Sequence, residues 1–575
     1  MDELPLRLIG RVSRTRGRWT FEPARRWRGG HRELVWSGPH APEPGDWIVA
    51  ELGDDGLAHL VELLGADDDP RWDDSAVVSQ HRLRTHFPRA ALDEADACHP
   101  PHGRDRDGRE DWREAVVFTI DPEDARDHDD ALSVRPAGHG RFEVGIHIAD
   151  VSHYVRADTA LDREARRRGT SCYLPGGVVP MLPERLSADL CSLRPDEDRL
   201  ALSVVARLDA DGSLQHYRFA ETVVRSRARL AYGEVQRALE GGAPLAREIQ
   251  HGCETLMTLA RALRARRLAA GALALEVPEV KAWVDAAGVP IRIERRPHLE
   301  SHDLIEEFML LANRCVGQEG ARRGSGVLYR VHESPVGRKL AELDLMLKTL
   351  GLPRLGSLDH PAAALQALLA VRLDPPRRRL LHRLVLRSLA RARYLDRDLG
   401  HFGLAAWEYV HFTSPIRRYP DLHNHRRVRE WIRGRGNAAW DPHQLERLAW
   451  ECSASEQTAT DAEREAVRVK TLRHLETRLG ERASGIITGL IPHGFFVELE
   501  DVPAEGFVRP SATLDDVFVL EPNGVRMTGR RTRRRFTLGD TVNVTVARVD
   551  VPGRECDLAL DAPLARRDRR KRRRP

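Results

Sequence analysis

Short apolar stretches separated by glycine and proline fill the beginning of the chain. Residues 8–12, 33–36 and 44–50 are examples. Short strands with frequent turns predict a small β-barrel over residues 1–66. Residues 67–110 are mostly polar, with Pro, His and alternating Arg and Asp. That composition predicts a linker.

The hydrophobic pattern changes after residue 110. Residues 115–120 and 142–149 are apolar stretches that predict buried strands. Further along, apolar residues recur at steps of three and four over 245–269, 302–320 and 380–394, which predicts helices. We therefore expect a mixed α/β domain over 111–475, long enough to bury a core of its own.

A second barrel is expected near the end of the chain, over residues 478–562. Glycines again separate short apolar runs there, as in residues 483–499 and 505–508. The predicted fold class is thus an α+β multidomain protein, in which a mixed α/β domain is flanked by two small OB-fold barrels.

Composition narrows the class of protein. The 575 residues are enough for three or four domains. No apolar run reaches 18 residues and no signal peptide precedes the first barrel, so we expect a cytoplasmic protein with no membrane partner. The 7 cysteines are scattered without a Cys-x-x-Cys pair, so neither a disulfide partner nor a cysteine zinc site is expected.

Charge adds one candidate contact with nucleic acid. The net charge is only +4, but residues 565–575 form a block dominated by arginine. Such a block engages phosphate backbones without sequence preference. The alternative is a tail that only improves solubility.

A dense acidic loop lies between the two predicted strands of the central domain. Five aspartates and one glutamate occur between Asp121 and Asp130. At the edge of a core these carboxylates could not all stay ionised without a cation. Oxygen ligands suit Mg²⁺ or Mn²⁺ better than zinc. The alternative is a solvated acidic loop.

The spacing argues against calcium. An EF-hand needs Gly at its sixth position and Glu at its twelfth, where this loop has Arg126 and Leu132. One or two Mg²⁺ ions held by such a loop would suit the hydrolysis of phosphodiesters by a metal-bound water.

These motifs resemble a known family. The pattern Asp-Pro-(x)4-Asp-x-Asp-Asp-Ala, starting at Asp121, is similar to the signature of the ribonuclease II / ribonuclease R exoribonucleases. Further similar motifs follow in order over about residues 111 to 475, at residues 147–155, 161–171, 173–175, 179–184, 190–193, 304–307, 401–404 and 411–421. The last of these is especially close to ribonuclease R.

The resemblance implies both fold and activity. It implies a cold-shock-like barrel at the amino end and an S1-type barrel at the carboxy end. The activity implied is processive hydrolytic 3′→5′ degradation of single-stranded RNA to 5′-mononucleotides. The implied cofactor is Mg²⁺ in a two-metal site, where Mn²⁺ can substitute.

The resemblance also assigns roles to single residues. Arg417 matches an arginine that clamps the scissile phosphate, and a guanidinium suits phosphate chemically. Glu463 matches a glutamate near the leaving nucleotide, with Glu465 as its rival. Asp129 is expected to take part in catalysis. The implied metal ligands are Asp121, Asp127, Asp129 and Asp130.

Other matched residues would contact RNA. Tyr173 matches an aromatic ring that grips the final nucleotides, whereas Leu275 stands where ribonuclease II has a phenylalanine. Tyr232 and Glu306 match residues linked to recognition of the ribose, whose 2′-hydroxyl both donates and accepts hydrogen bonds.

Aromatic residues in both barrels are candidates for stacking on bases. In the carboxy-terminal barrel these are Phe495, Phe496 and Phe507. Because a strand alternates its faces, only one of Phe495 and Phe496 should point outward. At the amino end, Trp19 and Phe21 lie among arginines, as in a stacking platform, although aromatic residues in small barrels are core residues about as often.

Two alternatives differ in class. One is an RNA-binding protein with a decayed catalytic site. The other is an enzyme acting on DNA or short oligonucleotides. We expect a monomer with single-stranded RNA as its partner.

Overall fold

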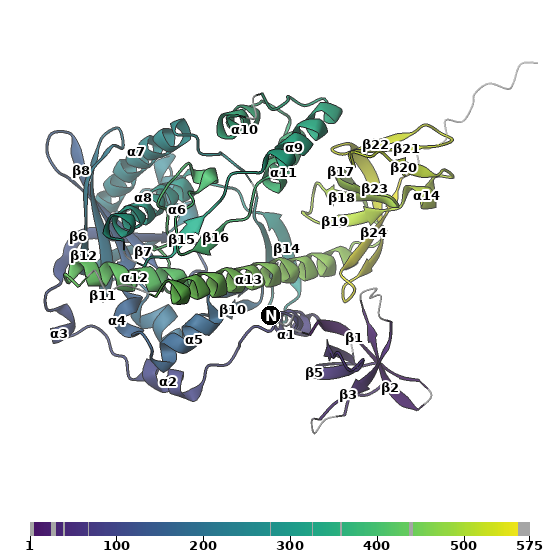
Figure 1. Cartoon of the computed structure of the whole chain (residues 1–575), viewed down its shortest axis with the longest axis horizontal. Helices are drawn as coiled ribbons and strands as arrows, with labels where there is room; N and C mark the ends of the chain where they lie inside the picture. The colour runs from purple at the N-terminus through teal and green to yellow at the C-terminus, as the bar shows by residue number, and fades with distance from the viewer. Residues whose placement is uncertain are drawn as a thin grey trace, which may run out of the picture.

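Three closed five-stranded barrels and a set of helices make up the molecule (Figure 1). The computed structural model describes residues 5–561 except 16, 25–29, 38–40, 67, 277, 325, 357–358 and 436–440. In the sequence, a mixed α and β domain comes between two small barrels, which confirms the predicted fold class. The basic block at 565–575 lies outside the described residues.

The amino-terminal barrel has the strand order β1-β2-β3-β5-β4. Its strands are β1 (Arg7–Thr15), β2 (Arg18–Pro23), β3 (Arg32–Val35), β4 (Trp47–Leu52) and β5 (Ala58–Gly65). Phe21 is fully buried in the barrel core, and Trp19 packs edge-on against Trp36 with ring centroids 5.6 Å apart. Phe21 is therefore a core residue and not part of a stacking platform.

The segment expected to be a linker contains four short helices. They are the 3-10 helix η1 (Pro70–Trp72) and the α-helices α1 (Asp73–Gln80), α2 (Arg89–Asp96) and α3 (Gly103–Arg106). The linker prediction is wrong for its first part, because Trp72 is buried and Lys470 Nζ donates to Asp73 Oδ2 at 2.9 Å. A buried carboxylate needs such a cationic partner, so the ion pair holds α1 against the long helix that carries Lys470.

The central barrel has the strand order β11-β12-β6-β7-β8. Its strands are β6 (Glu110–Asp121), β7 (Asp130–Pro136), β8 (Arg141–Ala149), β11 (Asp198–Asp209) and β12 (Leu214–Ala231). Strand β12 runs parallel to β6, and every other pair is antiparallel. The acidic loop is the connection between β6 and β7.

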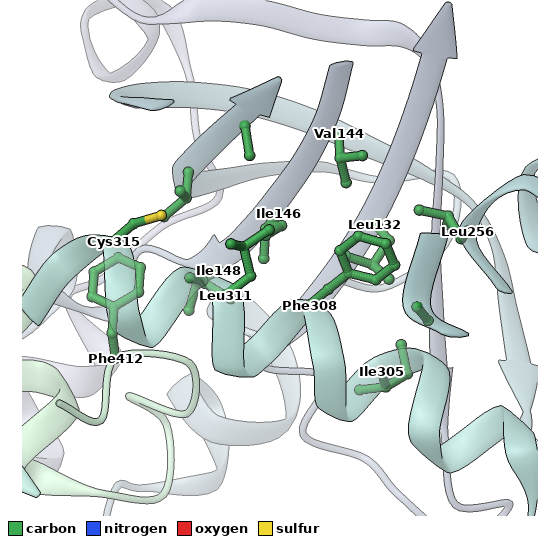
Figure 2. Packing of buried hydrophobic residues seen from close by; sticks show 14 of the residues in the cluster. Leu132, Val144, Ile146, Ile148, Leu256, Ile305, Phe308, Leu311, Cys315 and Phe412 are labelled. Carbon is green, nitrogen blue, oxygen red and sulfur yellow. The ribbon is translucent and has the colours of Figure 1, made fainter. Parts of the chain in front are cut away.

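Two predicted helices cover this barrel. They are α7 (Arg247–Ala269) and α8 (Glu300–Arg323). Figure 2 shows Ile305, Phe308 and Leu311 of α8 packed against strand residues such as Leu132 and Ile146. The apolar positions recur at three- and four-residue steps, so one stripe of the helix faces the strands.

The third predicted helix is shorter than expected. Helix α11 (Pro375–Ser388) ends before residue 394, and Tyr394 lies in strand β16 (Arg393–Leu395). Strand β16 pairs with β15 (Tyr329–Val331), so a tertiary partner overrides the local pattern there.

The rest of the central region consists of short elements and one long helix. The short elements that precede α8 are α4 (Val151–Tyr154), α5 (Ala160–Arg168), β9 (Cys172–Leu174), β10 (Gly177–Val179), the π-helix η2 (Arg185–Leu190), α6 (Tyr232–Leu239), β13 (Val280–Val284) and β14 (Pro290–Arg295). The later elements are α9 (Gly337–Leu350), α10 (Pro361–Leu369), η3 (Phe402–Leu404), α12 (Tyr419–Ile432) and α13 (Pro442–Glu476). Helix α13, with 35 residues, runs from the central domain towards the two outer barrels (Figure 1).

The carboxy-terminal barrel has the strand order β17-β18-β19-β24-β23, with a three-stranded sheet inserted. Its elements are β17 (Arg482–Ile491), β18 (Gly494–Leu499), β19 (Glu505–Val508), α14 (Pro510–Thr513), β20 (Phe518–Leu520), β21 (Arg526–Gly529), β22 (Arg535–Thr537), β23 (Thr541–Asp550) and β24 (Glu555–Leu560). Glu498 on β18 is paired with Arg295 and Arg383 of the central region. These ion pairs fasten the barrel to that region.

Within the described ranges, no helix is long and apolar enough to cross a membrane. All 7 cysteines fall in those ranges, and each is unpaired.

Candidate active site

A cavity of about 1790 Å³ connects the central domain with the carboxy-terminal barrel. One end is lined by the acidic loop and by the segment 413–418 that precedes α12. Strands β9, β10 and β13 and helices α8 and α13 form its walls, and residues 503–505 of the carboxy-terminal barrel lie at the other end. The lining includes nine of the expected site residues, namely Asp121, Asp127, Asp129, Asp130, Tyr173, Tyr232, Glu306, Arg417 and Glu463.

The local chain path explains why the aspartates meet. Asp121 ends β6 and Asp130 begins β7, so both lie at the same end of two neighbouring strands. The loop between them turns at Pro122, whose carbonyl accepts from the Ala125 N–H at 3.0 Å. Ser192 fixes its far side: the hydroxyl accepts from the His128 N–H at 3.0 Å and donates to the Arg126 carbonyl at 2.9 Å.

Asp129 is the most enclosed of the four carboxylates, with 4% of its surface exposed. Its Oδ1 accepts from the Ile416 N–H at 2.9 Å, and its Oδ2 lies 3.5 Å from Arg417 Nε. Among the described residues, Oδ2 has no hydrogen-bond partner. A buried carboxylate oxygen without a partner is costly, so this atom is poised to bind a cation.

Burial and crowding also act on the protonation of these groups. Burial, reinforced by the charge of Asp127, raises the pKa of Asp129 well above its usual range, against the opposing charge of Arg417. Burial and the charge of Asp121 raise the pKa of Asp130 in the same way. A bound divalent cation would favour the ionised forms of both. The donor set, carboxylate oxygens only, fits a hard divalent ion such as Mg²⁺.

His128 is a site residue that the sequence argument did not single out. Its Nδ1 lies 2.8 Å from Asp121 Oδ2, and its ring is buried. An imidazole at that distance orients the carboxylate from outside the cavity. The one sequence feature that could have indicated this role is the position of His128 between Asp127 and Asp129.

Tyr173 connects the acidic loop to α13. Its hydroxyl donates to Asp127 Oδ2 at 2.6 Å, and its backbone N–H donates to Glu463 Oε1 at 2.8 Å. Burial raises the pKa of Glu463. Glu465 instead meets Arg554 Nε at 3.1 Å and His81 Nε2 at 3.0 Å, and it does not line the cavity. The geometry favours Glu463 over its rival.

Tyr232 and Glu306 lie on another wall of the cavity. The Tyr232 ring stacks on His302 with centroids 4.1 Å apart, which holds it in place. Burial raises the pKa of Glu306, and its nearest cation is Arg267 at 3.7 Å. A phenol and a carboxyl are thus both available to a polar ligand.

Some expected residues lie elsewhere. Leu275 packs against the leucine-rich core of α9, α10 and α11 and does not line the cavity. Phe495 is fully buried against Phe536, with ring centroids 4.8 Å apart, so its assignment to RNA binding is wrong. Phe496 and Phe507 pair across β18 and β19 with their rings 5.2 Å apart and stay partly exposed. Strand alternation separates Phe495 from Phe496.

The basic side of the cavity includes residues that no motif indicated. Asp124 of the acidic loop lines the cavity and pairs with Lys281 of β13. Arg296, Arg464 and Arg468 are also in the lining. These side chains come from segments that are far apart in the sequence, so only the fold brings them together.

Two known domain families match the chain. The RNB domain matches residues 109–434 and the S1 RNA binding domain matches residues 476–560. The chain is 37% identical to ribonuclease R of Thermotoga maritima over 540 residues, which is 90% of this chain and 75% of that protein. It is also 37% identical to ribonuclease R of Aquifex aeolicus over 501 residues, 85% of this chain and 70% of the relative.

Solved structures have the same fold. Mycoplasma genitalium RNase R in complex with ribose methylated single-stranded RNA superimposes with a TM-score of 0.87 at 25% identity, covering 97% of this chain and 90% of that one. A yeast pseudonuclease shares the fold alone, at a TM-score of 0.73 and 19% identity over 92% of this chain and 68% of the other. The match to the RNB domain and the identity to curated relatives over most of the chain show that this protein belongs to the ribonuclease R family.

Proposed function

We propose that this protein is a hydrolytic 3′→5′ exoribonuclease that degrades single-stranded RNA processively to 5′-mononucleotides. The observation that carries the proposal is the buried Asp129: its Oδ2 has no hydrogen-bond partner among the described residues and lies 3.5 Å from Arg417 Nε, inside a cavity that Asp121, Asp127 and Asp130 also line. We expect it to act as a cytoplasmic monomer in RNA turnover.

Asp121, Asp127, Asp129 and Asp130 are the residues that would hold Mg²⁺, as one or two ions, with Mn²⁺ able to substitute. When bound, the metal supplies charge neutralisation of the phosphate and a water of lowered pKa. The residues themselves have to keep their oxygens directed into the cavity. The contacts of Asp129 with Ile416 and of Asp121 with His128 do this.

Arg417 would bind the scissile phosphate. Its side chain is 44% exposed towards the cavity and is anchored by donation to Ser414 Oγ at 3.1 Å. A guanidinium offers two parallel donors to phosphate oxygens, and its charge is best used where negative charge grows in the transition state. Glu463, held by the Tyr173 N–H, would lie on the leaving-nucleotide side.

Tyr232 and Glu306 would select ribose over deoxyribose. A substrate lacking the 2′-hydroxyl would lose its polar contacts with the half-buried Tyr232 and with Glu306, and the loss of such contacts is the basis of discrimination. A relative with this fold is in complex with ribose methylated single-stranded RNA in its solved structure. At the far end of the cavity, Phe496 and Phe507 would stack on unpaired bases before these enter.

The alternative is an RNA-binding protein without activity. The yeast pseudonuclease shows that the fold does not guarantee catalysis. In this chain all four aspartates, Arg417 and Glu463 are present and line one cavity. No feature of the site favours the decayed alternative.

The test is digestion of a 5′-labelled single-stranded RNA with Mg²⁺, comparing the wild type with Asp129→Asn. The wild type should convert full-length RNA directly to a short limit product, and Asp129→Asn should bind RNA without cutting it. Asp211→Asn is the matched control, because Asp211 is exposed and lies outside the cavity lining, and it should keep activity. Binding by the wild type without cleavage would refute the proposal.

A further inference from the structure

A cluster of two histidines and an aspartate lies outside the active-site cavity. His99 and His102 are in the loop between α2 and α3, and Asp105 is in α3. The ring centroids of the two histidines are 4.2 Å apart. None of the three residues lines the cavity described above. The name "histidine cluster" is used below for His99, His102 and Asp105.

The ligand atoms of the histidine cluster lie close to the spacing of a metal site. His102 Nδ1 lies 2.9 Å and His99 Nδ1 lies 3.8 Å from Asp105 Oδ2. All three ligand atoms are within 4.8 Å of one another. Around a tetrahedral Zn²⁺ with bonds of 2.0–2.2 Å, neighbouring ligand atoms are about 3.3–3.6 Å apart. Small side-chain rotations would therefore complete the geometry.

Asp105 is held in place from the opposite side. Its Oδ1 lies 3.4 Å from Nε2 of His153 on α4. His153 Nδ1 in turn lies 3.3 Å from a guanidinium nitrogen of Arg429, which can only donate. Nδ1 of His153 is thus the acceptor and Nε2 carries the hydrogen that faces Asp105. Oδ2 accepts from the His102 backbone N–H at 3.2 Å and faces the two imidazoles, so the carboxylate is preorganised as a ligand.

The two imidazoles are accessible to an ion from solvent. The side chains of His99 and His102 are 53% and 68% exposed, whereas that of Asp105 is 17% exposed. Each ring can carry its hydrogen on Nε2, which leaves a lone pair on Nδ1 for a metal ion. Imidazole nitrogens with one carboxylate suit zinc and related divalent transition ions, unlike the oxygen-only active site.

We propose that the histidine cluster binds one Zn²⁺-class ion through His99 Nδ1, His102 Nδ1 and Asp105 Oδ2, with water completing the shell. The ion would fasten the loop before β6 to α4 through Asp105 and His153. Its role is structural, and it is independent of RNA cleavage.

The test uses the full chain without an affinity tag, with excess Mg²⁺ to keep the acidic site filled by a hard cation. Zn²⁺ is titrated against a competing indicator. The wild type should bind one Zn²⁺ more than the double variant His99→Ala/His102→Ala, whose residual affinity should be at least about 10-fold weaker. The double variant His251→Ala/His443→Ala, which removes two exposed imidazoles elsewhere, should bind like the wild type.

Two further readouts keep the result interpretable. Zn²⁺ should raise the melting temperature of the wild type and of the control but not of the His99→Ala/His102→Ala variant. The RNase activity with Mg²⁺ should be the same in all three proteins. Equal Zn²⁺ stoichiometry and affinity in all three would overturn the proposal, and so would a Zn²⁺-induced stabilisation that survives loss of both histidines.

Discussion

The central and carboxy-terminal barrels are closed by the same number of strands but differ in where their polar and aromatic side chains lie. Each contains one parallel pair, β12–β6 and β19–β24. In the central barrel, carboxylates at the ends of β6 and β7 line a cavity. In the carboxy-terminal barrel, the aromatic rings of Phe496 and Phe507 lie on the outer face of β18 and β19. The difference shows that one barrel gathers carboxylates at its strand ends and the other presents aromatic rings on a strand face, and the proposed function assigns catalysis to the first and binding to the second.

The largest expected effect is on stability, and it should differ between the inner and outer faces of β18. Phe495→Ala should destabilise the carboxy-terminal barrel by about 3–5 kcal/mol, because the ring is fully buried against Phe536. Phe496→Ala, one position further, should cost less than about 1 kcal/mol. Denaturant unfolding of the full chain measures both. Equal losses would contradict the assignment of inner and outer faces.

The next effect concerns the strand-end site of the central barrel. Arg417→Ala should lower kcat by about 10²–10³-fold, since it removes a charge directed at the phosphate. Arg417→Lys should recover part of the loss, because the ammonium keeps the charge but lacks the paired donors. Single-turnover cleavage measures this. A raised KM with an unchanged kcat would instead show that Arg417 binds substrate and transition state equally.

The interior of the central barrel should make the protein sensitive to acid. His147 lies between Ser133 Oγ at 3.0 Å and Ser203 Oγ at 2.7 Å, and burial lowers its pKa to about 3. The folded ring stays neutral where the unfolded one protonates, below about pH 6.5. Stability is therefore complete above that pH and declines towards pH 3.

Between pH 7 and pH 5 this single group should cost about 2 kcal/mol. Urea unfolding at the two pH values should show a smaller loss for His147→Gln than for the wild type. His251→Gln, which changes an exposed histidine, should leave the loss unchanged. An identical pH dependence in all three proteins would assign the acid sensitivity to other groups.

The smallest effect tests the binding face itself. Phe507→Ala should weaken the affinity for single-stranded RNA by about 1 kcal/mol, at the lower end for base stacking, because the ring is only partly exposed. The rate of cleavage at saturating RNA should not change. Fluorescence anisotropy with an Asp129→Asn background measures binding without degradation. A reduced kcat would mean that the outer face contributes to the chemistry.

Much of this architecture was predictable from the sequence, for a physical reason. The aspartates lie between two buried strands, so local chain path alone brings Asp121 and Asp130 together. Helices with a long apolar stripe, such as α7 and α8, were equally predictable because their pattern and their packing agree. Periodicity also predicted that Phe495 and Phe496 face opposite ways, but not which of them is buried.

What was missed depends on contacts between distant segments. Helix α1 in the expected linker is held in place because Asp73 meets Lys470, which lies 397 positions away. The same holds for Lys281 beside Asp124, and for Leu275, which packs into a core built by later helices. No local pattern reports such partners.

Helix α13 places Glu463 at the cavity. Seven residues later it places Lys470, which anchors α1 next to the amino-terminal barrel. Seven residues are about 10 Å of helix, and the whole element is about 50 Å long. The helix is continuous between these two residues, so it holds them at a fixed separation. Any displacement of α1 is therefore transmitted along this helix to Glu463 at the cavity.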